Sequence, residues 1–427
     1  MSGQLVNAIE SMMSRMSQRS GVHNIALALV WLTMASSGFV FTEPCPTDAL
    51  TMALIVLLPA IGLVRFSAPA ALLMMILAGS AAFGLVSATA AFEMSKAVSH
   101  TLVSLYLYGA TFVLAGFVAL KPGAHSRLIF NGLTVAASIA GAAGLIGYFD
   151  LVPGADIFTK FGRASGTFKD PNVFGPFLVP AFLYAIHTAL ERPLTKAVPP
   201  LALAGFLALG IFLSFSRGAW MNLLAGLAIY AVLAFLTAAT NGRRQKIAAL
   251  AASGALLVCG VVGGALQSDK VSSLVSERAS VAQSYDVGPE GRFGGQEKAY
   301  GLILENPLGI GAGQFALVYH HEEPHNVYLS MPLNAGWLGA GFYDVAVALT
   351  LLAGLAGCFQ RSATQPVLLI AVAAFAANAF EGVIIDTDHW RHFYLLMALV
   401  WGMAPLGSTR AVFARAEPRR RVDYAAA

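Results

Sequence analysis

The spacing of the charged residues constrains this chain most strongly. Asp, Glu, Lys and Arg make up only 11% of the 427 residues, and many of them lie in short connectors and in two polar stretches, 149–172 and 267–326. Between them, apolar runs follow one another from about residue 24 to residue 407. A helix needs about 20 mostly apolar residues to cross a bilayer. The pattern therefore predicts a membrane protein with many spans.

The apolar runs predict helices rather than strands. They are continuous, whereas the strands of a membrane barrel alternate apolar and polar residues. A helix also satisfies its own backbone hydrogen bonds within lipid. We therefore predict an all-α polytopic membrane protein with about twelve transmembrane helices. Their apolar runs start near residues 24, 48, 68, 97, 126, 173, 198, 218, 247, 327, 366 and 391.

The basic residues predict how these helices are oriented. With an even number of spans both termini lie on one side, and the connectors of that side carry most of the Lys and Arg residues. Such residues favour the cytoplasmic side. The net charge of +4 thus reflects topology, and we expect no nucleic-acid partner. The predicted division is a cytoplasmic segment 1–23, a transmembrane bundle 24–407 with outer loops 149–172 and 267–326, and a basic cytoplasmic tail 408–427.

The two outer loops differ in predicted structure. The first is rich in Gly, Pro, Asp and Asn, which predicts turns, and we expect it to lie back on the bundle. In the second, residues 271–281 suggest an amphipathic helix on the membrane, and residues 293–304 suggest a helix that ends at Asn306. Arg292 would then lie at a helix N-terminus, where free N–H groups favour anions. The candidate polar contacts of the first loop are Arg163, Lys169, Asp170 and Asn172.

A short outer turn, residues 214–220, carries Arg217 and Trp220. An arginine deep in the hydrocarbon costs about 2.5–3.5 kcal/mol on insertion scales, and less where it can reach the interface. Arg217 is therefore either an interfacial anchor beside Trp220 or a ligand for an anion.

His325 lies where the long loop enters the next span, beside Asn326 and Tyr328. Residues 321–325 formally match the H-E-x-x-H zinc-protease pattern, which requires a helix. Pro324 would break that helix, so the sequence disfavours a protease. His325 is then either a polar interfacial residue or a general base, because neutral imidazole accepts protons near pH 7.

Two further sequence motifs have the form of a phosphate site and a metal site, but we predict neither site there. The glycines at 309, 311 and 313 imitate a phosphate loop, but no strand precedes them, so we predict turns. Asp386 and Asp388 imitate a metal motif in a short turn, which also carries Arg391, with no further carboxylate nearby in sequence. We predict no metal site and no cofactor.

Four blocks of sequence resemble the O-antigen ligase and O-antigen polymerase superfamily of bacterial envelope glycosyltransferases. Their order, and the long loop before the His-Asn pair, make the combination specific. The blocks are residues 163–175, residues 216–219, Arg292 with residues 305–313, and residues 325–329 with 334–336.

The resemblance implies a GT-C-like enzyme in the bacterial inner membrane with a periplasmic active site. It would transfer a glycan from a polyprenyl-pyrophosphate carrier to an acceptor sugar, without a metal or nucleotide sugar. We expect a ligase, whose acceptor is the lipid A-core, with a polymerase as the alternative. The expected catalytic residues are Arg217, Arg292 and His325, and the expected substrate contacts are Arg163, Lys169, Asp170, Asn172, Asn326, Tyr328, Asp388 and Arg391.

The residues suit this chemistry. Breaking the sugar–pyrophosphate bond leaves about three negative charges, which guanidinium groups bind bidentately without losing their own charge. The acceptor hydroxyl is a poor nucleophile, and a positioned base speeds its attack about 10²–10⁴-fold. His325 would be that base, and direct attack would invert the anomeric carbon. The groups that would orient it are Asn326, Glu322, Glu323 or Asp388.

Two other functions stay open from the sequence. A transporter or flippase for lipid-linked glycans would place ionisable residues within the spans, and Asp344, Glu381 and His187 are candidates. A peptidoglycan-type glycan polymerase would share the same multi-span architecture.

Overall fold

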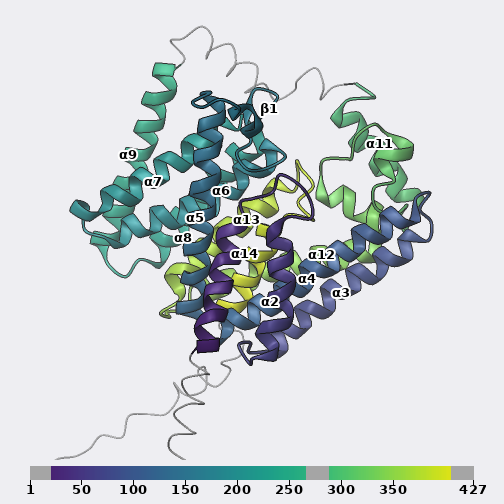
Figure 1. Ribbon diagram of the computed structural model, residues 1–427, viewed down its shortest axis with the longest axis horizontal. Coiled ribbons are helices and arrows are strands. Elements are labelled where there is room, and N and C mark those ends of the chain that lie inside the picture. The colour runs from purple at the N-terminus through teal and green to yellow at the C-terminus, as the bar shows by residue number, and fades with distance from the viewer. Residues whose placement is uncertain (1–20, 266–287, 405–427) are drawn as a thin grey trace, which may run out of the picture.

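The computed structural model describes residues 21–265 and 288–404 (Figure 1). The predicted amphipathic helix 271–281, the basic tail 408–427 and most of the segment 1–23 lie outside the described residues. The helices are Gly21–Ser36, α2 (Pro46–Ala60), α3 (Ala68–Ala88), α4 (Met94–Leu120), α5 (Pro122–Tyr148), α6 (Pro171–Glu191), α7 (Leu194–Leu213), α8 (Arg217–Thr237), α9 (Asn241–Ala265), α11 (Arg292–Glu305), α12 (Val327–Cys358), α13 (Gln365–Glu381) and α14 (Arg391–Met403).

These helices confirm the all-α class and a multi-pass architecture. Each of the apolar runs expected from the sequence falls within one of them. Within the described residues, seven helices are long and apolar enough to span a membrane, namely α3 to α8 and α12. Helix Gly21–Ser36, α2 and α13 are apolar but shorter. The total of about twelve spans and the GT-C-like likeness therefore stay predictions.

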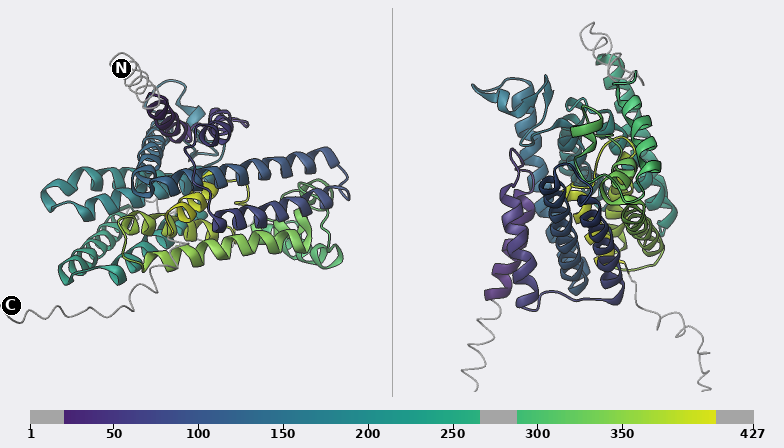
Figure 2. Two further views of the ribbon diagram at one scale, coloured as in Figure 1. Left: turned by 90° about the horizontal axis from the view of Figure 1, so that it is seen from below. Right: turned by 90° about the vertical axis from the view of Figure 1, so that its right-hand side faces the viewer.

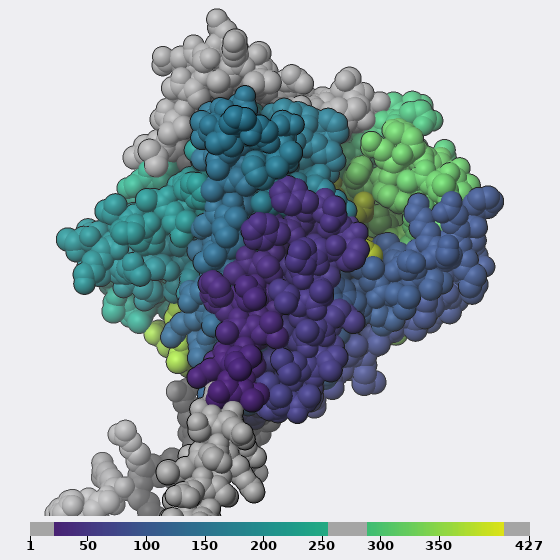
Figure 3. All heavy atoms as spheres, in the orientation of Figure 1, coloured from purple at the N-terminus to yellow at the C-terminus, as the bar shows by residue number. Residues whose placement is uncertain are grey.

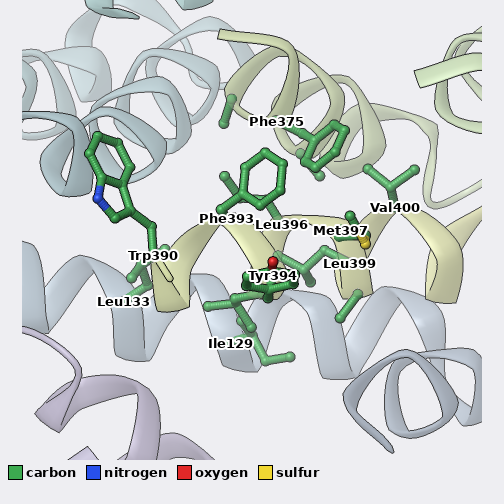
Figure 4. Close-up of a cluster of buried hydrophobic side chains, with 14 of the residues drawn as sticks. Ile129, Leu133, Phe375, Trp390, Phe393, Tyr394, Leu396, Met397, Leu399 and Val400 are labelled. Atoms are coloured by element: carbon green, nitrogen blue, oxygen red, sulfur yellow. The ribbon is translucent and has the colours of Figure 1, made fainter. Parts of the chain in front are cut away.

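Helix α14 forms the centre of the bundle (Figure 4). Every residue from His392 to Met403 is buried. Its aromatic and aliphatic side chains pack against α4, α5 and α13, as where Phe393 stacks on Phe375 with ring centroids 4.8 Å apart. Thirteen residues of helix span only about 20 Å, less than the hydrocarbon core. The sequence predicted one of about twelve spans here, and the structure has a short helix that lies inside a shell of others.

The loops that carry most of the candidate site residues meet at one end of the bundle, here called the loop end (Figure 2, right). Val40 pairs with Phe168, the Glu93 N–H donates to Gln314, and the Val327 N–H donates to the Gly382 carbonyl. The loop end comprises residues 37–45, 89–93, 149–170, 214–216, 288–326 and 382–390. The first outer loop and the described part of the second, residues 288–326, thus lie on the same side of the molecule.

The first outer loop lies back on the bundle, as the sequence predicts. It contains a 3₁₀ turn, Ala155–Phe158, and a small hairpin of β1 (Thr159–Lys160) and β2 (Arg163–Ala164), which the sequence did not predict. Gly166 has φ +54°, and a Cβ there would collide with the Ala140 carbonyl oxygen of α5. Glycine is needed for this close approach, and it fixes the loop beside α5.

The second outer loop confirms two predictions in the part that the structure describes. Helix α11 runs from Arg292 to Glu305, and Gly291 is its N-cap residue. The glycines at 309, 311 and 313 form a turn with positive φ, and the Gly311 N–H donates to Ser87 Oγ. This turn packs on α3, so its backbone does not form a phosphate cradle. A π-helical turn, η2 (Phe315–Tyr319), leads to the His-rich segment.

Candidate functional site

The segment from His320 to Asn326 is not helical, which agrees with the sequence argument against a zinc protease. His325 has φ +52°, a left-handed conformation that is uncommon for residues other than glycine. Such strain gathers at functional sites, where surrounding contacts hold it. The contacts here are with α11, because Arg292 donates to the His325 carbonyl (3.2 Å) and Gln296 donates to the Pro324 carbonyl (3.2 Å).

The imidazole of His325 lies between two carboxylates. Its Nε2 is 3.3 Å from Glu322 Oε2, and its Nδ1 is 4.0 Å from Asp386 Oδ2. Glu322 is exposed, whereas Asp386 accepts a hydrogen bond from the Ser330 hydroxyl of α12. Asp386 is therefore the fixed partner of His325, and Glu322 occupies the side that faces solvent.

Asp386 and Asp388 have pKa values shifted in opposite directions. Burial, together with the charge of Asp388, raises the pKa of Asp386. Burial would also raise the pKa of Asp388, but hydrogen bonding to His100 and the nearby His389 outweigh it and hold that pKa at about 2. When the pKa values of two neighbouring carboxyl groups are shifted apart, one group can stay charged while the other holds a proton. Asp388 therefore stays charged at pH 7.

Sequence reasoning missed the histidines around Asp388. His100 Nε2 of α4 is 3.3 Å from Asp388 Oδ2, and the rings of His100 and His389 stack with centroids 3.9 Å apart. His389 Nε2 lies 3.0 Å from Ser104 Oγ. Burial lowers the pKa of His389 to about 4, against the opposing effect of Asp388, so this ring is neutral at pH 7. Asp388, expected as a substrate contact or as one of the groups that orient His325, pairs with His100, and its contact with substrate stays a prediction.

Glu323 gives a prediction about stability and pH. Burial, then the charge of Asp386, raises its pKa from 4.5 to about 7. Between these pH values the folded protein keeps a proton that the unfolded chain releases, so stability falls as pH rises through this window. Glu323→Gln should remove this fall and stabilise the protein above pH 7 by on the order of 1–3 kcal/mol. Thermal unfolding midpoints in detergent, on either side of the window, test this; equal pH dependence in both proteins would contradict it.

A cavity of about 300 Å³ opens beside these groups. Asp386, Asp388, His389 and Arg391 line its mouth. Its inner wall is apolar, with Leu107, Leu114, Leu133, Phe177 and Leu395 from α4, α5, α6 and α14. In Figure 3 a few yellow atoms of the C-terminal part show in a hollow between the purple N-terminal helices and the green segment that holds α11. The His325–Asp386 pair thus adjoins a cavity that runs into the bundle.

Arg391 and Lys169, expected as substrate contacts, are paired with carboxylates. Arg391 binds Asp48 bidentately, with Nε–Oδ1 at 2.6 Å and Nη2–Oδ2 at 2.8 Å, and also reaches Glu43 at 3.2 Å. Lys169 pairs with the same Glu43. Burial would raise the pKa of Glu43, but Lys169 and Arg391 lower it. Two cations and two carboxylates thus balance here, and this network ties the loop before α2 to α14.

This network gives a second prediction. Asp48→Asn should lower the stability of the protein by about 3 kcal/mol, because it leaves the Arg391 charge partly buried beside an amide. A lower thermal midpoint in detergent would show this, with exposed Asp156→Asn as the matched control. If Asp48→Asn leaves the midpoint unchanged but weakens substrate binding, Arg391 acts on substrate rather than on structure.

The arginine of the first outer loop connects to the short turn before α8. Arg163 donates from Nε to the Ser214 carbonyl and from Nη2 to Asn172 Oδ1, each at 2.7 Å. Asp170 caps α6 by accepting from the Asn172 N–H at 2.7 Å. The three residues therefore hold the loop on the N-terminus of α6. Their expected contact with substrate stays a prediction.

Arg217 is the first residue of α8, and Ser216 caps that helix by accepting from the Ala219 N–H. The next residue, Gly218, approaches Glu381 so closely that a Cβ would collide with its Oε1. Glu381 also accepts from Asn222 at 2.6 Å and is fully buried. Glu381, the transport candidate of the sequence, thus joins α8 to the end of α13.

These contacts connect the short turn that carries Arg217 to His325. Gly382 follows Glu381, and its carbonyl accepts from the Val327 N–H at 2.8 Å, two residues after His325. Asn326 caps α12 through the Tyr328 N–H, and the Tyr328 hydroxyl donates to the Ala379 carbonyl of α13. Arg217, Arg292 and His325 therefore come from elements that meet around the end of α13. The side chains of Asn326 and Tyr328 support this junction, and their contact with substrate stays a prediction.

Comparison with known proteins agrees with this arrangement. Residues 202–343 match the family model described as O-antigen ligase. The matched range includes Arg217, Arg292 and His325, whereas Arg163, Asp386 and Asp388 lie outside it. No curated protein matches the chain. The match confirms the resemblance found in the sequence: residues 202–343 of this chain are similar to the O-antigen ligase family.

Proposed function

We propose that this chain transfers a glycan from a polyprenyl-pyrophosphate carrier to an acceptor sugar at the periplasmic face of the bacterial inner membrane. The proposed acceptor is the lipid A-core, as for an O-antigen ligase. One observation supports this most strongly. Arg292 and Asp386 flank His325 beside a cavity at the loop end, in a multi-pass protein similar to this family.

Arginines take the role of stabilising the leaving group. The departing polyprenyl pyrophosphate carries about three negative charges, and guanidinium binds phosphate oxygens in a bidentate manner. Arg217 and Arg292 are the first residues of α8 and α11, so the free N–H groups of both helices add to the attraction for an anion. Each charged hydrogen bond contributes about 1.5–3 kcal/mol. Two arginines can therefore supply a large part of the leaving-group stabilisation.

His325 takes the role of general base. In the proposed tautomer, Nδ1–H points to Asp386 and Nε2 faces the acceptor hydroxyl, which displaces the exposed Glu322. The hydroxyl oxygen attacks the anomeric carbon as its proton passes to Nε2, and the bond between that carbon and the pyrophosphate oxygen breaks. Attack opposite the leaving group inverts the anomeric configuration. In this reaction the arginines balance the charge, and no metal takes part in breaking the bond.

The shape of the cavity fits an amphipathic substrate. Its mouth carries the charged groups and its wall is apolar, which suits a molecule that joins a polar head to a hydrocarbon chain. We place the sugar–pyrophosphate junction near His325 and the carrier lipid toward the apolar wall. The natural partners in this proposal are the lipid-linked donor, the acceptor glycolipid and the surrounding membrane lipids.

Deleting the gene and separating the surface glycans on a gel tests this function. A ligase predicts that complete repeat chains accumulate on the carrier while the acceptor stays bare. A polymerase of the same superfamily predicts finished acceptors with a single repeat unit. Unchanged surface glycans would contradict both, and an accumulation of donor on the cytoplasmic side would indicate a flippase instead.

A further inference from the structure

Three metal-ligating side chains converge on the loop before α11, outside the reacting groups described above. Glu290 Oε2 lies 4.0 Å from His320 Nε2 and 3.7 Å from His321 Nδ1. The two imidazole rings are 4.3 Å apart between centroids. One nitrogen or oxygen ligand atom from each residue lies within 4.8 Å of the others. This is the donor set of a divalent transition metal.

His320 provides independent evidence for a ligand. Its side chain is only 3% exposed, and among the described residues its Nε2 has no hydrogen-bond partner. Its Nδ1 lies 3.1 Å from the Glu322 carbonyl oxygen and 3.3 Å from the Glu322 N–H. The carbonyl only accepts and the N–H only donates, so the two contacts suit opposite tautomers, and a metal on Nε2 requires the one with its proton on Nδ1. Nε2 then presents a buried, unpaired lone pair toward Glu290, which is costly unless a cation takes it up.

The ring of His320 is also held in place, as a metal ligand requires. Metal-binding histidines usually donate their second N–H to a backbone carbonyl, and the Glu322 carbonyl lies 3.1 Å from Nδ1 to accept it in the tautomer that binds metal. The ring stacks on Phe315, with centroids 5.8 Å apart. On its other side it packs on Gly295 of α11, where an added Cβ would lie 3.1 Å from the ring. The position of Nε2 is therefore fixed by three different elements of the loop.

We propose that Glu290, His320 and His321 bind a divalent metal ion of the zinc class. Tetrahedral zinc with bonds of about 2.0–2.1 Å places its ligand atoms about 3.3 Å apart. The separations of 3.7 Å and 4.0 Å exceed this by less than 1 Å. Glu290 and His321 are exposed, so both can close on an ion that His320 anchors. Three protein ligands leave the fourth position for water.

The metal would act as a structural clamp and not as a participant in the transfer. It would join the residues just before Arg292 to the segment just before His325, and so fix both groups. The expectation of no metal site, drawn from the sequence, rested on Asp386 and Asp388 and on the non-helical 321–325 pattern. Glu290 lies about thirty residues from His320, so no short motif includes all three ligands.

A second cluster meets the same distance criterion but is already paired. His100 Nε2 is bound to Asp388 at 3.3 Å, and His389 Nε2 lies 3.0 Å from the Ser104 hydroxyl. In that cluster the ring nitrogens that would serve as ligands have protein partners. It therefore provides a matched control for the proposed site.

Metal titration of the purified full-length protein in detergent tests the proposal. After chelator treatment, the wild type should take up one equivalent of Zn²⁺ or Co²⁺, measured by elemental analysis, and Co²⁺ should give the visible absorption of a tetrahedral site. His320→Ala and His321→Ala should each weaken binding more than about tenfold. His389→Ala should bind like the wild type. Zn²⁺ should also raise the thermal midpoint of the wild type but not of His321→Ala.

The outcomes separate the alternatives. His321 is exposed, so its substitution should leave folding intact and isolates the loss of a ligand. A wild-type protein that takes up no metal would overturn the proposal. So would a His321→Ala protein that binds as tightly as the wild type. If His389→Ala instead abolishes binding, the ion belongs to the cluster around Asp388. None of these readouts depends on glycan transfer, so they stand apart from the proposed function.

Discussion

Replacing His325 by alanine should reduce glycan transfer by about 10²–10⁴-fold, the usual contribution of a positioned general base. The acceptor hydroxyl would then have to attack without losing its proton to Nε2. Asp386 cannot substitute, because the structure fixes it on the far side of the ring, where Ser330 binds it. The rate of glycan transfer by purified protein, measured with saturating donor, reports this loss.

A second variant separates chemistry from folding. His325 has φ +52°, and asparagine tolerates this left-handed backbone better than alanine does. His325→Asn keeps a polar side chain but has no basic nitrogen, so it should fold like the wild type and be as inactive as His325→Ala. His23→Ala is the matched control and should be active, because His23 lies in the first turn of helix Gly21–Ser36, whose other end leads into the loop end. Near-normal transfer by His325→Asn would show that another group accepts the proton.

Replacing Arg217 by lysine should lower the transfer rate about 10- to 100-fold. Lysine keeps the charge but loses the fork of N–H donors, and one charged hydrogen bond contributes about 1.5–3 kcal/mol. The loss should fall on kcat rather than KM, because the charge on the leaving group develops in the transition state. Steady-state kinetics on a defined lipid-linked donor measure both terms. Arg292→Lys should show the same loss of kcat.

The alternative role for Arg217 gives a different result. As an interfacial anchor it would act with Trp220, whose indole N–H donates to the Phe212 carbonyl while its ring stacks on Phe212. Lysine anchors at an interface equally well. Unchanged kinetics in Arg217→Lys would therefore favour the anchor. Arg361→Lys, exposed in the connector between α12 and α13, controls for the loss of any surface guanidinium.

The features predicted correctly from the sequence are those that local physics determines. Continuous apolar runs predict helices because lipid requires internally satisfied backbones, and every run became a helix. Asn306-Pro307 marked the end of α11, and Pro324 kept the His-rich segment out of a helix. Gly166, Pro171 and Gly175 predicted a fixed loop, and the structure shows that a Cβ at residue 166 would collide with α5.

The features that the sequence did not predict depend on contacts between distant segments. The sequence offered Asn326, Glu322, Glu323 or Asp388 to orient His325, and Glu322 does lie 3.3 Å from its ring. The second carboxylate beside the ring, Asp386 at 4.0 Å, was not among them. A turn gives no signal for which of two carboxylates faces inward. His100 and Asp48 lie in N-terminal helices that carry no family motif, and they reach the site only because those helices pack against the chain around residue 390. Their polar character within apolar helices was the only available indication.

In the proposed reaction, glycosidic bond formation and release of the carrier are one chemical event. The most direct measurement mixes the purified protein with a lipid-linked glycan and an acceptor glycolipid, and counts both products. We expect one polyprenyl pyrophosphate released for each glycan joined to acceptor, with the anomeric configuration inverted. Movement of intact donor across a vesicle membrane, without released carrier or a new glycosidic bond, would contradict it.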